Sequence, residues 1–253
     1  MKDPRSLLIT GASSGIGEAL ARAYAAPGIH LALAGRNSAR LSRVAQACKD
    51  LGAEVATGAL DVTQRADLAA WIKEIDADHP LDLVVANAGI SAGTGGGGED
   101  QEQSRAIFAV NMTGVANTLF PAVELMAPRK RGQLAIMSSL ASFRGFPGAP
   151  AYCASKAAVR VWGESLRGSL HKDGLEVSVI CPGYVKSRMT DANDFPMPFL
   201  MEADKAAGII KRGLAKNKGR IVFPLRLYAM VWLLAALPPS WIDPLLRQLP
   251  EKT

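Results

Sequence analysis

Strand-length apolar runs alternate with amphipathic helical stretches from residue 6 to residue 223, and this alternation constrains the fold more than any other feature. The short runs place Val, Ile, Leu and Ala on consecutive positions, which is typical of strands buried on both faces. The stretches between them carry apolar residues three and four positions apart, as a helix lying on a sheet requires. Repeated units of this kind form parallel sheets with right-handed crossovers. We therefore predict an α/β fold, with a doubly wound parallel sheet of about seven strands and helices on both faces.

The predicted elements follow one another without an internal repeat or a long linker. The predicted strands are Ser6–Thr10, His30–Ala34, Glu54–Ala59, Leu81–Ala86, Gln133–Ser138, Glu176–Cys181 and Arg220–Phe223. The predicted helices are Gly15–Ala26, Ser38–Leu51, Arg65–Asp76, Glu102–Met126, Ala151–His171 and Ala203–Lys216. We expect one domain over residues 1–224, with residues 225–253 as an apolar and basic C-terminal extension of it.

A glycine-rich turn, from Thr10 to Gly17, follows the first predicted strand and opens the first predicted helix. Its glycines have the spacing Gly-x-x-x-Gly-x-Gly. Glycines let the backbone turn tightly and come close to a pyrophosphate. The N-terminus of the following helix supplies N–H groups and a positive dipole. The residues expected to bind a dinucleotide here are Gly11, Ser13, Ser14, Gly15, Ile16 and Gly17. An ordinary strand-to-helix turn is the alternative, and the flanking strand and helix favour the dinucleotide site.

The second predicted strand ends at Gly35-Arg36, where a dinucleotide fold meets the adenosine ribose. An acidic residue at this point binds the 2′-hydroxyl of NAD, but this strand end has no Asp or Glu. Arg36 can instead pair with a 2′-phosphate through its planar guanidinium, and Arg40 and Arg43 add positive potential. NADP(H) is therefore the preferred cofactor, with NAD(H) as the second option.

Tyr152 and Lys156 lie four positions apart at the start of a predicted helix, so their side chains share one face. A tyrosine, with a pKa of about 10, works as an acid–base catalyst at neutral pH only if a cation stabilises its phenolate. Lys156 can provide that cation and is expected to lower the pKa of Tyr152. Ser138 and Ser139 end the fifth predicted strand, at the edge where α/β sheets build their sites. A hydroxyl there can donate to a substrate oxygen that gains negative charge.

In order and spacing, these motifs resemble the single-domain short-chain dehydrogenases/reductases, over roughly residues 5–223. The resemblance implies a Rossmann-like fold and hydride transfer between a nicotinamide and a carbonyl carbon. It favours Ser139 over Ser138 as the residue that polarises the oxygen, with Tyr152 delivering the proton. Lys156 and Asn111 would form a relay to solvent.

The same resemblance implies further cofactor contacts and requires no metal. The residues at the matching positions are Asp61, Val62, Asn87, Ala88, Gly89, Pro182, Gly183, Val185 and Ser187, in addition to Tyr152 and Lys156. The family usually has threonine where this chain has Ser187, which retains the hydroxyl group.

Residues 184–202 occupy the position of the family's substrate lid. Within them, Arg188–Met201 contains three methionines and two phenylalanines, which can close an apolar wall over the site together with Phe143 and Phe146. We therefore expect an apolar ketone or aldehyde as substrate, although these residues can equally pack into the core or a subunit contact. A 3-oxoacyl carrier-protein reductase, using Lys186 and Arg188 to meet an acidic carrier, is the rival enzyme. A catalytically silent dinucleotide-binding regulator is disfavoured because all four catalytic positions are filled.

The C-terminal residues need an explanation of their own. Residues 205–253 carry a net charge of +7, against −1 for residues 1–204, and they interleave the charges with leucine and tryptophan, so we expect no nucleic-acid partner. Leu227–Leu237 is apolar all round and so cannot face water as a helix, yet it is too short to cross a bilayer. It can lie in a groove of its own chain, in a subunit contact of a homodimer or homotetramer, or at a membrane surface through residues 225–247.

The remaining features favour a cytoplasmic protein, which can also contact a membrane surface. Three cysteines lack the spacing of a zinc site or a disulfide framework, and no signal-peptide pattern is seen at the start. No apolar run approaches the ~20 residues that a transmembrane helix needs.

Overall fold

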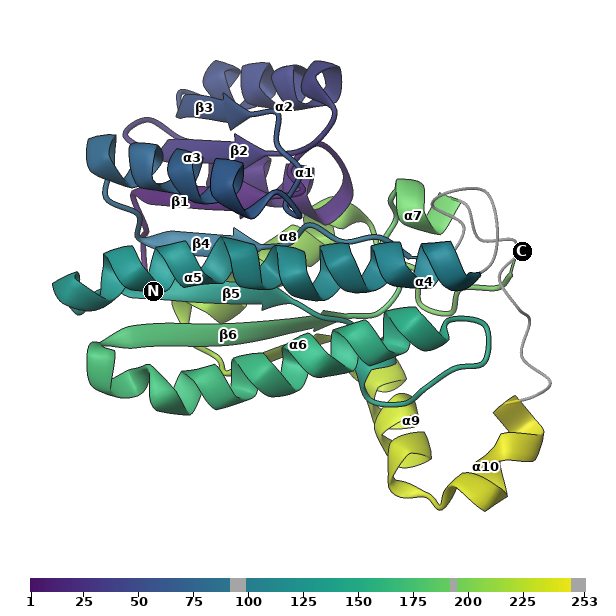
Figure 1. Cartoon of the computed structure of the whole chain (residues 1–253). Helices are drawn as coiled ribbons and strands as arrows, with labels where there is room; N and C mark the ends of the chain where they lie inside the picture. Colours follow the sequence, from purple (N-terminus) through teal and green to yellow (C-terminus); the bar gives the residue numbers. More distant parts are fainter. Residues whose placement is uncertain (92–98, 192–194, 247–253) are drawn as a thin grey trace.

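The computed structural model describes residues 1–91, 99–191 and 195–246, and in these ranges seven parallel strands form one sheet (Figure 1). The strands are β1 (Ser6–Thr10), β2 (His30–Ala34), β3 (Glu54–Gly58), β4 (Leu83–Ala86), β5 (Gly132–Met137), β6 (Leu175–Pro182) and β7 (Arg220–Phe223). Their order is β3-β2-β1-β4-β5-β6-β7, so the direction of winding reverses between β1 and β4. This is the predicted doubly wound sheet, and the carboxyl ends of its strands meet at one edge.

Helices cover both faces of the sheet, as predicted. One layer consists of α1 (Gly15–Tyr24), α2 (Ser38–Asp50) and α8 (Ala203–Ala215), in which α1 contacts both other helices. The other layer, in front of the sheet in Figure 1, consists of α3 (Arg65–Asp78), α4 (Gln101–Phe108), α5 (Gly114–Met126) and α6 (Pro150–Ser169). Leu7 and Ile9 of β1 pack toward the first layer and Leu8 toward the second. Burial on both faces therefore explains the consecutive apolar residues of the central strands.

The ends of the predicted elements agree with the structure to within two residues, with one internal exception. The predicted helix Glu102–Met126 is interrupted by a π-helical turn, η1 (Ala109–Thr113), between α4 and α5. The sequence showed no apolar run long enough to span a bilayer, but one helical segment of the structure passes that test. The path Gln101–Arg129 is long and apolar enough to cross a membrane, by length and composition alone. Half of its most apolar stretch is buried within the fold, and its parts contact α3 and α6, which is typical of a core helix.

Sequence reasoning missed several short elements. They are the 3₁₀ turns η2 (Ala127–Arg129), η3 (Leu140–Ser142) and η4 (His171–Asp173), and the helices α7 (Arg188–Asp191) and α10 (Pro239–Leu246). Each is too short for an apolar period to show in the sequence.

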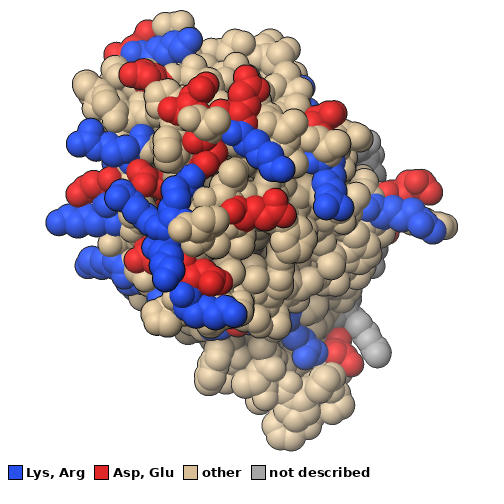
Figure 2. Space-filling view, turned by 60° about the vertical axis from the view of Figure 1, so that its left-hand side comes forward, with Lys and Arg blue, Asp and Glu red and all other residues tan. Residues whose placement is uncertain are grey.

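The C-terminal extension contributes α9 (Leu225–Ala236) in addition to α10. Leu227 and Val231 of α9 are buried in an apolar cluster with Leu140 of η3 and with Val179 and Cys181 of β6. A groove of its own chain, one of the three expected locations, covers only one side of α9. Side chains exposed by 55% to 73% are Leu225, Met230, Trp232 and Leu233 of α9, and Trp241 of α10. Figure 2 shows that the lower end of the molecule, where these helices project, carries few charged side chains.

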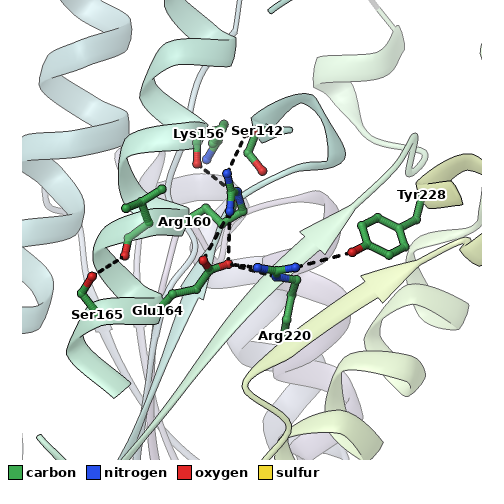
Figure 3. A network of polar contacts seen from close by, with 9 residues as sticks. Ser142, Lys156, Arg160, Glu164, Ser165, Arg220 and Tyr228 are labelled. Atoms are coloured by element: carbon green, nitrogen blue, oxygen red, sulfur yellow. Dashed lines mark hydrogen bonds and ion pairs between the residues drawn. The ribbon is translucent and has the colours of Figure 1, made fainter. Parts of the chain in front are cut away.

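A polar network fixes α9 to α6 and β7 (Figure 3). The Glu164 carboxylate accepts a hydrogen bond from Arg220 Nε at 2.9 Å and one from Arg160 Nη1 at 3.3 Å. The Phe143 ring centroid lies 4.5 Å from Arg160 Cζ and 5.2 Å from Arg220 Cζ, and it meets the Tyr228 ring of α9 edge-on. Phe143 therefore supports the C-terminal helix.

A buried ion pair joins the end of α3 to the turn before β5. The Asp76 carboxylate, in a residue only 5% exposed, accepts hydrogen bonds from Arg129 Nη2 at 2.8 Å and from the Leu81 N–H at 2.9 Å. Burial opposes ionisation of Asp76, but the hydrogen bonds outweigh it and hold the pKa of this carboxyl below its ordinary value. The pair thus depends on Arg129.

Replacing Arg129 with alanine is expected to lower the free energy of unfolding by about 3–5 kcal/mol, because a buried carboxylate loses its cation. The matched variant is Lys186→Ala, whose side chain is 60% exposed and pairs with Glu202, which is 72% exposed, with an expected loss of at most about 1 kcal/mol. Urea unfolding at neutral pH, followed by circular dichroism, measures both.

The pH dependence gives a second measure of the same contact. Because the folded-state pKa of Asp76 is depressed, the pair stabilises the fold above the unfolded-state pKa of about 3.9 and loses this contribution as pH falls through the folded-state value. The difference in the free energy of unfolding between the wild type and Arg129→Ala should therefore become smaller in acid. Equal losses in the two variants at neutral pH would contradict the assignment.

Candidate active site

The glycine turn between β1 and α1 lies against the end of β4, where the strand order reverses. Gly11 and Gly15 have φ angles of +66° and +59°, which a residue with a side chain rarely adopts. A Cβ atom on Gly11 would lie 2.8 Å from the Ala88 Cα, and one on Gly17 would collide with the Gly11 carbonyl oxygen. Ser14, the N-cap of α1, makes no capping hydrogen bond through its side chain. The turn therefore offers bare backbone and a helix N-terminus to an anion such as a pyrophosphate.

Asn87, Ala88 and Gly89, after β4, hold this turn in place. Asn87 Nδ2 donates to the Thr10 carbonyl oxygen at 2.9 Å, and the N–H groups of Asn87 and Ala88 donate to Thr10 Oγ1 at 3.1 and 3.2 Å. A Cβ atom on Gly89 would lie 3.2 Å from both Asn111 Oδ1 and Lys156 Nζ. These three residues thus border the glycine turn on one side and two predicted catalytic residues on the other.

The end of β2 meets the same turn. A Cβ atom on Gly35 would lie 3.4 Å from Ser13 Cβ, so the strand end and the turn are in contact. The side chain of Arg36 is 61% exposed, and its only ion pair among the described residues is a long contact of 3.9 Å with Asp61. Asp61 also accepts hydrogen bonds from the Thr63 N–H and hydroxyl, so its carboxylate is largely committed to its own loop. The guanidinium of Arg36 therefore remains available to an anion.

Tyr152 and Lys156 lie on the first turns of α6, and Ser139 lies at the N-cap of η3, directly after β5. Lys156 is 3% exposed, and its Nζ donates to the Met137 carbonyl oxygen at 2.9 Å. The rival serine, Ser138, donates its hydroxyl to the Lys156 carbonyl oxygen at 2.8 Å and so belongs to the contact between β5 and α6. The structure therefore brings Ser139, Tyr152 and Lys156 together at the carboxyl edge, with Ser138 committed elsewhere.

The expected effect of Lys156 on Tyr152 is not found in this structure. Burial raises the pKa of Tyr152 to about 12, and a hydrogen-bonding interaction with Ser139 acts in the opposite direction. Lys156 Nζ lies 5.8 Å from the centre of the Tyr152 ring, and burial lowers the pKa of this amine to about 8. Lys156 is not among the groups that shift the pKa of Tyr152, so proximity in sequence was not sufficient to predict the direction of the shift.

Asn111 lies in the π turn η1, and its side chain joins two elements. Its Oδ1 accepts from the Ile90 N–H at 2.8 Å, and its Nδ2 donates to the Ile90 carbonyl oxygen at 2.9 Å and to Ser155 Oγ at 3.1 Å. Ser155 in turn donates to the Tyr152 carbonyl oxygen at 2.8 Å. Asn111 therefore links the loop after β4 to the helix of the tyrosine. A π turn widens the helix locally, and such turns are frequent at functional sites.

Sequence reasoning missed Glu99, which caps the helix that carries Tyr152. The N-cap residue of α6, Ala149, has no side chain that can cap, and Glu99 accepts from the N–H groups of Ala151 at 2.5 Å and Tyr152 at 3.1 Å. Its negative charge also contributes to the raised pKa of Tyr152. The only signal in the sequence was an α6 start, Ala-Pro-Ala, without a capping residue.

The segment after β6 folds back onto the glycine turn. Its predicted contact residues are Pro182, Gly183, Val185 and Ser187, and a Cβ atom on Gly15 would lie 3.0 Å from Ser187 Cβ. Thr190, which the sequence did not single out, fixes this position: its Oγ1 accepts from the Ser187 N–H at 2.8 Å and donates to the Val185 carbonyl oxygen at 3.1 Å. Ser187 thus lies against the glycine turn, held by a neighbouring threonine.

The predicted lid residues run from Tyr184 to Glu202, and a β-bridge between Val185 and Met201 ties the two ends together. Phe195 meets the Tyr184 ring edge-on at 6.2 Å, and the nearby charge of Tyr184 contributes to the raised pKa of Tyr152. Tyr184 is therefore a second site residue that the sequence did not indicate. Phe199 and Leu200 are each 45% exposed.

A mainly apolar pocket of about 660 Å³ opens beside this site, between η3, the start of α6 and α10. Phe143 and Phe146 line it, together with Cys153 of α6 and Leu246 of α10. Tyr152 does not line the pocket. The face of α6 that borders the pocket is the adjacent one, which carries Cys153.

Two parts of the predicted regions lie outside the described residues, namely 192–194 within the lid and 247–253 in the C-terminal extension. Among the residues that the structure describes, no group of three or more His, Cys, Asp or Glu side chains is arranged to hold a metal ion.

Comparison with known proteins agrees with this geometry. The sequence model of the short chain dehydrogenase family matches residues 5–195. An uncharacterized oxidoreductase of Myxococcus xanthus is 40% identical over 246 residues, which are 97% of this chain and 97% of that protein.

Two solved structures show the same fold at 24% identity, each covering 98% of this chain and 97% of the other. One is a short-chain dehydrogenase from Sphingobium yanoikuyae in complex with NADPH, with a TM-score of 0.78. The other is a short chain dehydrogenase/reductase from Burkholderia phymatum in complex with NAD, with a TM-score of 0.82. With the family match over most of its length and the site at the carboxyl edge of its sheet, the chain belongs to the short-chain dehydrogenase/reductase family.

Proposed function

We propose that the protein is an NADP(H)-dependent oxidoreductase that interconverts an apolar ketone or aldehyde and its alcohol. The observation that carries this proposal is the convergence of Ser139, Tyr152 and Lys156 beside the glycine turn, with Asn111 and Lys156 both against Gly89. The glycine turn fits a dinucleotide because any side chain at Gly11 or Gly17 would fill the space next to the backbone. The bound nicotinamide would supply or accept the hydride.

The chain's own residues would handle the proton and the substrate oxygen. In the reducing direction, the Tyr152 hydroxyl donates its proton to the carbonyl oxygen as the alcohol forms, while Ser139 donates a hydrogen bond to the same oxygen. The pKa of Tyr152, raised to about 12 by burial, keeps the phenol protonated before this step. Lys156, buried next to Gly89 and the Met137 carbonyl, is placed to stabilise the phenolate that remains.

The choice of NADP(H) over NAD(H) is supported by the end of β2 and not by the fold. The two related structures hold NADPH and NAD in the same architecture. Here Arg36 takes the place of an acidic ribose ligand, and Arg40 and Arg43 follow it on α2. NAD(H) is the second option.

A 3-oxoacyl carrier-protein reductase is the alternative enzyme, and it would use Lys186 and Arg188 to meet an acidic carrier. In the structure, Lys186 Nζ lies 3.3 Å from Glu202 Oε1, so its charge is partly balanced by its own chain. This contact favours a small apolar carbonyl substrate. A panel of ketones, aldehydes, steroids and acyl thioesters separates these alternatives, with turnover measured as the loss of NADPH absorbance. A silent regulator would show no turnover with any of these compounds.

We also propose that the chain self-associates through exposed apolar side chains on α4, α5 and α6 and on the turn η1. Phe108, Met112, Phe120 and Val161 are exposed by 37% to 57%, and α4 contacts α6. An apolar surface of this kind suits a homodimer or homotetramer. We place the protein in the cytoplasm, with membrane contact restricted to α9 and α10.

Tyr152→Phe is expected to remove most turnover, by about 100-fold or more, and to leave NADPH binding nearly unchanged, because the hydroxyl acts only in the transition state. Steady-state kinetics and fluorescence titration of NADPH measure the two effects. Lys156→Ala should impair both, since that side chain lies beside the dinucleotide turn. A Tyr152→Phe enzyme with near-wild-type rates would refute the mechanism.

Arg36→Ala is expected to weaken NADPH binding by about 1–3 kcal/mol and to leave NADH binding almost unchanged, because the guanidinium pairs with the 2′-phosphate alone. Isothermal titration with both cofactors measures the difference. Equal losses for NADPH and NADH would assign Arg36 to another part of the cofactor and defeat the predicted preference.

The exposed side of α9 and α10 is expected to bind anionic vesicles reversibly through its tryptophans, which suit a membrane interface. Flotation of the wild-type chain with phosphatidylserine vesicles is compared with a Trp232→Ser/Trp241→Ser variant, which spares the buried Leu227 and Val231. Loss of flotation in the variant would support the membrane role. A wild-type chain that stays with the soluble fraction would show that this surface serves a subunit contact or the fold alone.

A further inference from the structure

Four arginines gather where the end of β2 approaches the segment after β6. Arg36 follows β2, Arg40 and Arg43 belong to α2, and Arg188 begins α7. The pKa of Arg40 is lowered by burial, and then by repulsion from Arg188, Arg43 and Arg36 in that order. Among the charged neighbours of Arg40, the strongest influence thus comes from a residue about 150 positions away in the sequence, on the substrate side of the molecule.

Within the described part of the chain, one carboxylate, that of Asp61, reaches this cluster, and its contact is long. Arg36 forms a 3.9 Å ion pair with Asp61. Among the described residues, no ion pair includes Arg40, Arg43 or Arg188. The Nε atom of Arg40 is buried and makes no hydrogen bond. Four positive charges that share one distant carboxylate, together with the unsatisfied buried Nε of Arg40, indicate a site for an anionic ligand.

The position of Arg188 follows from its backbone. Ser187 lies against the glycine turn, 3.0 Å from where a Gly15 Cβ would be, and the Thr190 hydroxyl and the Asp191 N–H both bond within this short segment. On the other side of the same turn, Gly35 lies against Ser13. The glycine turn is therefore flanked by Arg188 on one side and by Arg36 and Arg40 on the other.

We propose that Arg188 completes the site for the 2′-phosphate of NADP(H), opposite Arg36 and Arg40. This inference rests on the proposed preference for NADP(H). A guanidinium pairs with phosphate oxygens through two parallel hydrogen bonds, so arginines from two sides can enclose one phosphate. Arg188 lies three residues after Val185, which forms a bridge with Met201, so a phosphate bound by Arg188 would lie close in the chain to this bridge.

The test compares Arg188→Ala with the wild type in isothermal titrations against NADPH and NADH, which differ only in the 2′-phosphate. We expect the Kd for NADPH to rise about tenfold or more and the Kd for NADH to change by less than about twofold. The matched control is Arg212→Ala, an exposed arginine of α8 without an ion pair among the described residues, which should bind both cofactors as the wild type does.

Hydrogen exchange gives a readout that a purely structural role would not change. NADPH should slow exchange in residues 185–191 of the wild type more than saturating NADH does, and Arg188→Ala should remove this difference. Arg188→Lys, which keeps the charge but loses the paired geometry, should recover only part of the NADPH affinity.

The outcomes separate this inference from the proposed function. If the wild type prefers NADPH and Arg36→Ala abolishes the preference while Arg188→Ala retains it, the inference fails and the cofactor assignment stands. Equal losses for NADPH and NADH in Arg188→Ala would assign the residue to the pyrophosphate and also overturn the inference. A wild type without any preference for NADPH would overturn both.

Discussion

The close approach of the backbone at Gly11 and Gly17 to the end of β4, and at Gly15 to Ser187, is the constraint on which the rest of the site depends. Because these residues lack side chains, α1 can begin directly behind β1 and the residues after β4 can lie against the turn. Asn87 and Thr10 then lock the two strand ends together through hydrogen bonds. Gly89 extends the same close packing to Lys156 and Asn111. One turn therefore defines both a place for a dinucleotide and the distance from it to the catalytic side chains.

The helix that carries Tyr152 is positioned by contacts from four parts of the chain. Glu99 caps its N-terminus, Asn111 reaches it through Ser155, and Ser138 bonds to its backbone at Lys156. Further along, Glu164 joins it to Arg220 and thus to α9. Gly163 lets it lie close to the sheet, since a Cβ atom there would be 2.7 Å from the side chains of Ile136 and Val179. A rigid first turn of α6 is what a proton donor needs, because small displacements of a catalytic group cost rate.

The C-terminal extension has two different sides. One side supports η3 and the Phe143 ring beneath the site, so α9 is part of the structure that holds Ser139 in place. The other side exposes apolar side chains that a monomer in water would be expected to cover. α10 adds a wall to the pocket beside α6, with Arg144 and Asp243 paired across it at 3.4 Å.

The sequence by itself determined the sheet, the order of the helices and the identity of the motif residues, because buried parallel strands, amphipathic helices and glycine turns leave local patterns. Only the tertiary structure decided what those residues contact. It placed Glu99 on the helix of Tyr152, introduced the π turn at Asn111, and turned Phe143 toward α9. It also reversed the expected shift of the Tyr152 pKa, since burial depends on everything packed around a group and spacing along a helix does not report it. Likewise, Arg188 influences the charge of Arg40 only because two strand ends distant in the sequence meet at one edge of the sheet.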